Sequence, residues 1–277
     1  MFKLAFFCWL IWGLGACVSD QATLPVALPT TTTLPSDSNS IPKVDSIPLG
    51  LQQFIEAYPE QHLQAKGQQL IWPDSFSLVY ADSSTWPSFW DSLERPTLAL
   101  QVAQSYPKGE EYSLPQRNQD PGRIRVNAFF EKMYGDNKAA VQAKLVSVDF
   151  LGTPVRITTV NGVHKRLAAV AKALEKHPEW HRYCLPTAGT FNWRPIAGTS
   201  RMSSHSFGIA IDLNVKWANY WRWAVAPKEG TGPRPILYKN RLPLGLVALF
   251  EQEGFIWGGK WYHYDTMHFE YRPELLQ

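Results

Sequence analysis

The chain has 277 residues, of which 45% are hydrophobic and 18% are charged, and this composition excludes a wholly disordered protein. The formal net charge is only +3 at pH 7 and no dense run of lysine and arginine occurs, so we do not expect nucleic acid as a partner. A chain of this length can form one large domain or two small ones.

The first residues have the pattern of an export signal. Lys3 is followed by an apolar run over residues 4–16, which is shorter than the roughly 20 residues that a membrane-spanning helix needs. The run ends in Leu14-Gly15-Ala16-Cys17, which resembles the lipobox of bacterial lipoproteins. We therefore predict a lipoprotein signal peptide over residues 1–17, lipidation of Cys17, and export to the periplasmic or cell-surface side of a bacterial membrane. An ordinary signal peptide cut near Ala16 is the alternative.

Residues 18–48 are rich in threonine, serine and proline, and they are predicted to form a disordered tether. Residues 49–150 are predicted to form a mainly helical N-terminal extension, in which no chemical motif occurs. Its helices are expected near residues 51–58, 88–105, 124–134 and 137–145, with two strand-like runs within 69–81.

Residues 151–277 are predicted to form the domain that carries the chemistry, and the expected fold class is α+β, with a small antiparallel sheet flanked by helices. Strands are expected at 146–151, 155–160, 187–193, 206–214 and 267–271. Helices are expected at 162–176, where apolar residues form one stripe, and from Pro243 to Gly254.

Two candidate metal ligands, His205 and Asp212, lie in the segment SSHSFGIAID at residues 203–212. An odd separation within one continuous strand would place the two side chains on opposite faces. They can converge only if His205 lies on a turn before the strand, and Gly208 permits such a bend. A histidine in such a place is more often an ordinary polar residue than a ligand, so this segment alone leaves both readings open.

A second pair, Asp265 and His268, lies in the segment YDTMHFE at residues 264–270. Two histidines and one carboxylate fill three zinc positions and leave the fourth for water, and two imidazoles favour zinc over calcium or magnesium. Zinc lowers the pKa of that water, and Asp265 is then placed to accept its proton and pass it to the leaving amine. Cys184 is the one cysteine beyond residue 17, which excludes a cysteine-rich site.

The two segments together resemble the D-alanyl-D-alanine carboxypeptidase family of zinc peptidases, which includes vancomycin-resistance carboxypeptidases and phage endolysins that cut L-alanyl-D-glutamate bonds. The matching residues are Ser203, His205, Gly208, Ala210, Asp212, Asp265 and His268. The resemblance covers residues 155–273 and implies that His205, Asp212 and His268 bind Zn²⁺ and that Asp265 is the base. Carboxypeptidase members usually carry glutamate as the base, so Asp265 is more similar to the endopeptidase branch.

Further residues near the two segments are candidates for substrate contacts. Arg194 resembles the family arginine that stabilises an oxyanion or clamps a substrate carboxylate, and Arg201 competes for that role. A surface ion pair is the alternative for each arginine. Ser203 is expected to hydrogen-bond substrate or to orient the loop. Glu270 is expected to support His268 from the same face of the strand, and His263 is expected at the rim.

These observations predict zinc-dependent hydrolysis of peptide bonds in peptidoglycan stem or cross-bridge peptides, with water activated by zinc and Asp265. The alternatives are a D-alanyl-D-alanine carboxypeptidase, a zinc peptidase acting on other peptides, and a non-catalytic peptidoglycan-binding lipoprotein. The expected partners are peptidoglycan peptides and, through the lipid on Cys17, a membrane whose identity as inner or outer stays open. We expect a monomer.

Overall fold

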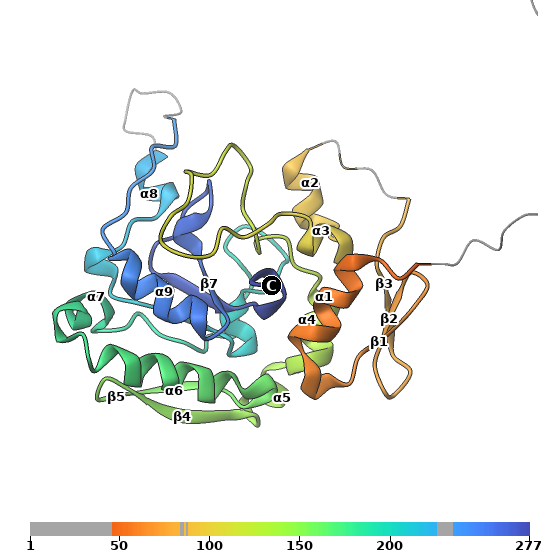
Figure 1. Ribbon diagram of the computed structural model, residues 1–277, viewed down its shortest axis with the longest axis horizontal. Coiled ribbons are helices and arrows are strands. Elements are labelled where there is room, and N and C mark those ends of the chain that lie inside the picture. Colours follow the sequence, from red (N-terminus) through yellow and green to blue (C-terminus); the bar gives the residue numbers. More distant parts are fainter. Residues whose placement is uncertain (1–45, 84–85, 87, 226–234) are drawn as a thin grey trace, which may run out of the picture. The chain divides into compact units, whose positions relative to one another are not determined.

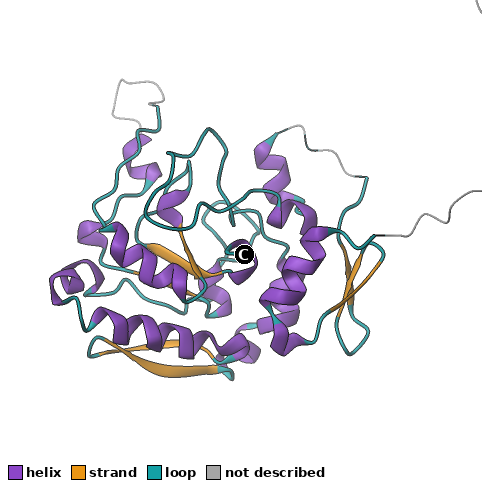
Figure 2. Ribbon diagram, in the orientation of Figure 1, coloured by secondary structure: helices purple, strands orange, loops and turns teal. Residues whose placement is uncertain are grey.

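The helices and strands of the protein are mixed along the chain, as the computed structural model shows for residues 46–83, 86, 88–225 and 235–277 (Figures 1 and 2). The α-helices are α1 (Leu49–Ala57), α2 (Phe89–Glu94), α3 (Leu98–Val102), α4 (Asn127–Tyr134), α5 (Lys138–Gln142), α6 (Val163–Leu174), α7 (His181–Cys184), α8 (Trp221–Val225) and α9 (Leu244–Gln252). The strands are β1 (Gln64–Lys66), β2 (Gln69–Ile71), β3 (Ser77–Val79), β4 (Leu145–Phe150), β5 (Thr153–Thr158), β6 (Ala210–Asp212), β7 (Phe255–Trp257) and β8 (His268–Tyr271).

Helices combined with small antiparallel sheets confirm the predicted α+β class. The predicted signal peptide with Cys17, and the predicted tether up to residue 45, lie outside the described residues. Among the helices that are described, none has the length and apolar character needed to cross a membrane.

The sheet that carries the candidate site has the strand order β6-β8-β7, and all its pairs are antiparallel. Its register places Asp212 opposite His268 and Ala210 opposite Glu270. Strand β7 was not predicted, although it lies between the two predicted segments in the chain. The register brings the two predicted segments onto neighbouring strands.

Helix α6 packs between the β4–β5 hairpin and α9, and α9 in turn packs on β7 (Figure 1). The predicted apolar stripe of α6 is confirmed, because Val163, Leu167, Val170 and Leu174 are all fully buried. Burying an aliphatic side chain of this size contributes about 1.5–3 kcal/mol. The hairpin, α6 and α9 therefore form a packed support behind the sheet of the site.

Residues 49–150 contain the helices α1 to α5, as expected, and also the antiparallel sheet β1-β2-β3, of which β1 was not predicted. The predicted domain boundary at residues 150/151 falls in the turn that joins β4 to β5. The division into an extension and a catalytic domain stays a prediction.

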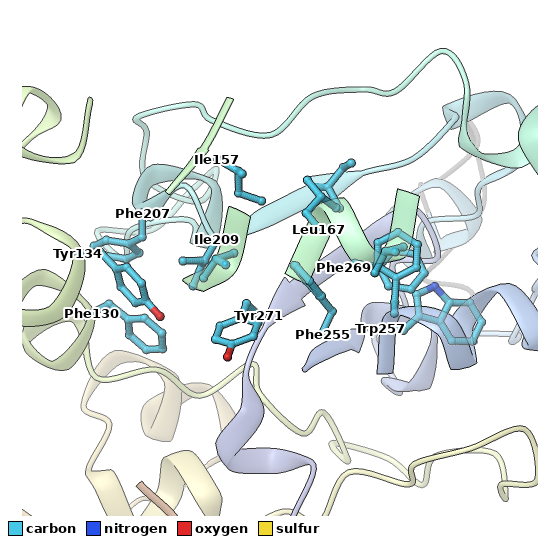
Figure 3. Packing of buried hydrophobic residues seen from close by; sticks show 14 of the residues in the cluster. Phe130, Tyr134, Ile157, Leu167, Phe207, Ile209, Phe255, Trp257, Phe269 and Tyr271 are labelled. Carbon is cyan, nitrogen blue, oxygen red and sulfur yellow. The ribbon is translucent and has the colours of Figure 1, made fainter. Parts of the chain in front are cut away.

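Residues from both stretches share one hydrophobic core (Figure 3). Phe130 and Tyr134 of α4 lie beside Phe207, and the ring centroids of Phe130 and Phe207 are 5.6 Å apart. Phe207 follows His205 by two positions, so α4 supports the turn on which this histidine lies.

The expected strand at residues 187–193 was wrong. This segment is a loop, joined to the sheet by a single bridge between Gly189 and Asp212, and Gly189 has a φ of 119° that a regular strand does not contain. The expected strand at 206–214 is shorter than predicted, because Ser204–Phe207 form a 3₁₀ turn and only Ala210–Asp212 pair as a strand.

Candidate metal centre

His205 lies on a tight turn that ends at Gly208. The 3₁₀ turn Ser204–Phe207 closes with Gly208 in the left-handed region, at φ 65° and ψ 30°. A Cβ at Gly208 would also lie 2.5 Å from Cδ2 of Leu145. Glycine is therefore required here both by its backbone conformation and by the space available. The expectation that His205 lies on a turn before the strand is confirmed.

Three side chains converge at the end of the β6–β8 pair. Oδ1 of Asp212 lies 3.2 Å from Nε2 of His205 and 2.9 Å from Nδ1 of His268. The two ring nitrogens are 3.3 Å apart. Ligands of one tetrahedral ion with bonds of about 2.0–2.1 Å are separated by roughly 3.3 Å, so the spacing suits a zinc-sized cation. The three residues can hold a metal ion.

The other nitrogen of each ring is fixed by an acceptor. Nδ1 of His205 lies 2.5 Å from the carbonyl oxygen of Thr190, to which it can only donate. Nε2 of His268 lies 3.1 Å from Oε2 of Glu270 and 3.2 Å from Oγ of Ser204. When each ring keeps its proton on that outer nitrogen, the lone pairs of both inner nitrogens face the same point. Glu270 contacts His268 as expected, and the role of His268 as a metal ligand stays a prediction.

The charges around the three candidate ligands favour a cation among them. Burial acts to raise the pKa of Asp212, but the charges and hydrogen bonds of His205 and His268 hold it well below its usual range. Burial acts to lower the pKa of His268, but Asp212 and Glu270 raise it to about 10. A proton or a metal ion can supply the positive charge that these carboxylates favour.

Asp265 lies on the loop before β8. Its backbone N–H donates to the carbonyl oxygen of Gly258 at 2.9 Å, and its own carbonyl oxygen accepts from the N–H of His268 at 3.2 Å. Within the described residues, its Oδ1 is buried without a hydrogen-bond partner. Burial raises the pKa of this carboxyl group to about 6, and the charge of Asp212 acts in the same direction. A carboxylate oxygen without a hydrogen-bond partner, on a group with a raised pKa, is suited to accept a proton.

A cleft of about 360 Å³ opens beside these residues and exposes them to a ligand. Its lining includes the three candidate metal ligands, Asp265 and Ser203, together with the arginines Arg123, Arg125, Arg194 and Arg222. The hydroxyl of Ser206 bonds the backbone of Arg194 at 3.0 Å and 2.9 Å, which ties this arginine to the turn of His205.

Arg201 does not line this cleft. Its Nε donates to Oε1 of Glu94 at 3.0 Å, so Arg201 makes the ion pair that was its alternative role. Arg194 and Ser203 are brought together with the candidate metal ligands, whereas Arg201 is not. The roles of all three in substrate binding stay predictions.

Several residues of the site were not found from the sequence. Arg123 and Arg125 come from a stretch without a recognisable motif.

The expectation that His263 lies at the rim was wrong, because it is 4% exposed and its Nδ1 lies 2.7 Å from Oδ2 of Asp120. Asp120 precedes His263 by 143 positions, and no local pattern indicates this pairing.

The comparisons with known proteins point to the same segment. No curated protein and no solved structure matches the chain. The model of one protein family, described as D-alanyl-D-alanine carboxypeptidase, matches residues 197–271. These residues contain His205, Asp212, Asp265 and His268. Residues 197–271, which hold the candidate metal ligands, are therefore similar to the D-alanyl-D-alanine carboxypeptidase family of peptidases.

Proposed function

We propose that the protein is a zinc-dependent peptidase that hydrolyses peptide bonds in peptidoglycan stem or cross-bridge peptides. The observation that carries the proposal is the convergence of His205, Asp212 and His268 beside Asp265, whose buried Oδ1 has no hydrogen-bond partner among the described residues. The family match at residues 197–271 supports peptidase activity.

Zinc is proposed as the metal because of the donor set. Two imidazole nitrogens and one carboxylate oxygen are typical of hydrolytic zinc sites, whereas calcium and magnesium prefer oxygen ligands alone. When bound, zinc supplies Lewis acidity, which acidifies water and polarises a peptide carbonyl group. His205 and His268 would hold the ion through Nε2 and Nδ1, because their other nitrogens face Thr190 and Glu270.

Asp265 is proposed as the general base. Its buried Oδ1 can accept a proton from the attacking water, and the same carboxyl group can then donate it to the leaving amine. Its raised pKa suits both steps, because a base that is too weak or too strong transfers the proton in one direction only.

The arginines of the cleft are proposed to select an acidic peptide. Arg194 can clamp a substrate carboxylate or stabilise a developing oxyanion, and Ser203 can hydrogen-bond the peptide backbone. Asp265 in place of glutamate favours an internal bond, by resemblance to the endopeptidase branch. Arg123 and Arg125 already pair with Asp120 and Glu270. Arg194 and Arg222 favour a substrate with a free carboxylate, which keeps D-alanyl-D-alanine carboxypeptidase activity as the second candidate.

Export and membrane anchoring are part of the proposal and rest on the sequence alone. The apolar run at residues 4–16 and the following Cys17 support a lipoprotein that acts on the periplasmic or cell-surface side of a bacterial membrane. We propose that it acts as a monomer.

Digestion of purified peptidoglycan tests the proposed activity. The unmodified protein should release peptide fragments whose masses identify the cleaved bond. Asp265→Ala should lower the rate by about 10²–10⁴-fold, because it removes the base, while zinc binding is retained. Asp149→Ala is a matched control, since Asp149 is an exposed carboxylate on β4. Equal product release by Asp265→Ala and Asp149→Ala would overturn the proposed mechanism and favour a non-catalytic binding protein.

A further inference from the structure

A buried group of charged residues surrounds the carboxylate of Glu270, which contacts His268. Glu270 is fully buried, and its carboxylate contacts two guanidinium groups, that of Arg125, 145 positions before it, and that of Arg272, two positions after it. Nη1 of Arg125 lies 3.1 Å from Oε2 of Glu270, and Nη1 of Arg272 lies 2.9 Å from Oε1. Oε2 is also the atom that accepts from Nε2 of His268 at 3.1 Å.

We propose that Arg125 is a positioning residue for the metal centre, through which residues 49–126 help to set the zinc affinity of His268. The proposal rests on the proposed function, because it requires that His268 is a zinc ligand. Arg125 lies outside the matched family segment at residues 197–271 and precedes Glu270 by 145 positions.

Arg125 contacts Oε2 of Glu270, the same oxygen that holds the imidazole ring of His268 in place. A carboxylate with one partner can rotate, but Oε1 of Glu270 is bound by Arg272 while Arg125 and His268 share Oε2. The carboxylate is therefore restrained at both oxygens. This holds the proton of His268 on Nε2 and points the lone pair of Nδ1 towards Asp212, 2.9 Å away.

The second guanidinium is anchored in turn by the N-terminal stretch. Nε of Arg272 donates to Oε1 of Glu274 at 2.6 Å, and the hydroxyl of Tyr58 in α1 donates to Oε2 of Glu274 at 2.6 Å. Gln101 of α3 donates to Glu274 at 3.4 Å, and its own Oε1 accepts from the N–H of Val126 at 2.9 Å. The backbone next to Arg125 is thus linked to the same network.

The charges of this network balance, which makes its burial physically reasonable. Two arginines, Arg125 and Arg272, face two glutamates, Glu270 and Glu274, and all four side chains are at most 9% exposed. A buried charge costs several kcal/mol unless it is paired and hydrogen-bonded, and removing one partner leaves the other uncompensated. Loss of Arg125 would therefore leave the buried charge of Glu270 only partly compensated, and the contact of Glu270 with His268 would change as a result.

Zinc affinity measured by competition with a chromophoric chelator tests the proposal on the full chain. Arg125→Met removes the charge at nearly constant length and should weaken zinc binding by about 10–100-fold, the usual effect of losing a residue that orients a metal ligand. Glu270→Gln should weaken it by a similar factor. Because only one nitrogen of Arg125 contacts Glu270, Arg125→Lys should recover part of the loss.

Arg166→Met is the matched control. Arg166 also pairs with a glutamate, Glu253, but its side chain is 55% exposed and lies on α6, away from the cleft. The zinc affinity of the Arg166→Met protein should equal that of the unmodified protein. Equal zinc affinities for folded Arg125→Met and Arg166→Met would overturn the positioning role alone. Failure of the unmodified protein to bind zinc would instead overturn the proposed function and the inference with it.

A second measurement does not depend on the folding of Arg125→Met. Nitrogen-15 NMR of the zinc-loaded unmodified protein and of Arg125→Lys reports which ring nitrogen of His268 carries the proton. We expect a protonated Nε2 in both, with faster exchange of this proton in Arg125→Lys. A protonated Nδ1, or identical exchange in the two proteins, would contradict the proposal.

Discussion

Nε2 of His205 and Nδ1 of His268 face each other at 3.3 Å, although the two residues are 63 positions apart in the chain. The opposite nitrogen of each ring faces an acceptor, Thr190 or Glu270, so in the neutral rings the facing nitrogens present lone pairs. Oδ1 of Asp212 lies within 3.2 Å of both. Three electron-rich atoms at these distances repel one another unless a cation lies among them.

Removal of metal should therefore abolish activity. We expect a strong chelator to stop peptide release and to lower the melting temperature, because an ion that binds only the folded state stabilises it, by about 2.7 kcal/mol at 100 times its Kd. Added zinc should restore both. Chelation is complete when the residual metal is below about a tenth of the protein concentration. Activity that persists in such a sample would contradict a metal mechanism.

Treatment with a thiol-alkylating reagent tests whether activity depends on the thiol of Cys184 instead of on a metal ion. Cys184 is fully buried, and burial raises the pKa of its thiol to about 12, so little reactive thiolate forms near neutral pH. Alkylation followed by peptide mapping should leave Cys184 unlabelled in the native protein, with activity unchanged. Loss of activity on alkylation of Cys184 would point to a role for this thiol.

Arg194 and Arg201 should differ in their effect on catalysis. Arg194 lines the cleft, whereas Arg201 is paired with Glu94. Arg194→Met should lower kcat/KM by about 10–100-fold, the equivalent of one charge-assisted hydrogen bond of about 1.5–3 kcal/mol. Arg201→Met should lower it by less than about threefold, since a partly exposed ion pair contributes little. The reverse order in steady-state kinetics would assign the substrate contact to Arg201.

Gly208→Ala should weaken both the fold and the metal site. The new Cβ meets Leu145 at 2.5 Å, and the positive φ is unfavourable for alanine, so a loss of about 1–3 kcal/mol in the free energy of unfolding is expected. Gly67→Ala is the matched control, because Gly67 has a φ of 55° but no neighbour within 4 Å. Equal losses in urea unfolding, with zinc affinity unchanged in Gly208→Ala, would show that the close contact is unimportant.

Stability should fall at alkaline pH because of three buried tyrosines. Burial raises the pKa of Tyr58, Tyr106 and Tyr134, and Glu274 and Glu251 add to this at Tyr58 and Tyr106. The folded pKa then exceeds the unfolded value of about 10, so the stabilisation is complete below that pH and is lost as the pH rises above it. Above about pH 10, each tyrosine should lower the free energy of unfolding, measured with urea, by up to about 1.4 kcal/mol per pH unit. Tyr58→Phe should make this decline of stability with pH less steep. A slope unchanged by Tyr58→Phe would contradict the burial of its hydroxyl in the network.

The sequence was sufficient to predict the residues that converge, but not the network that holds them. His205, Asp212 and His268 could be found because each lies in a short segment with a recognisable spacing. The turn at Gly208 was predicted from the odd separation of His205 and Asp212, since a straight strand would have kept them apart.

The contacts of Arg125 and Asp120 could not be predicted in this way. Each joins its partner across more than 140 positions, and neither lies in a periodic pattern that indicates the pairing. The loop at 187–193 was predicted as a strand because its composition is strand-like. The strand preference of these residues does not decide the structure here, because Gly189 has a positive φ and the segment joins the sheet only through the bridge between Gly189 and Asp212.

The metal centre is tested most directly by anomalous diffraction at the zinc absorption edge from crystals grown with zinc. One strong peak should lie among Nε2 of His205, Oδ1 of Asp212 and Nδ1 of His268, at about 2.0–2.2 Å from each. Asp212→Ala crystals grown in the same way should show a weaker peak or none. A folded protein with no peak at this position, or with zinc only at other sites, would contradict the proposed zinc peptidase.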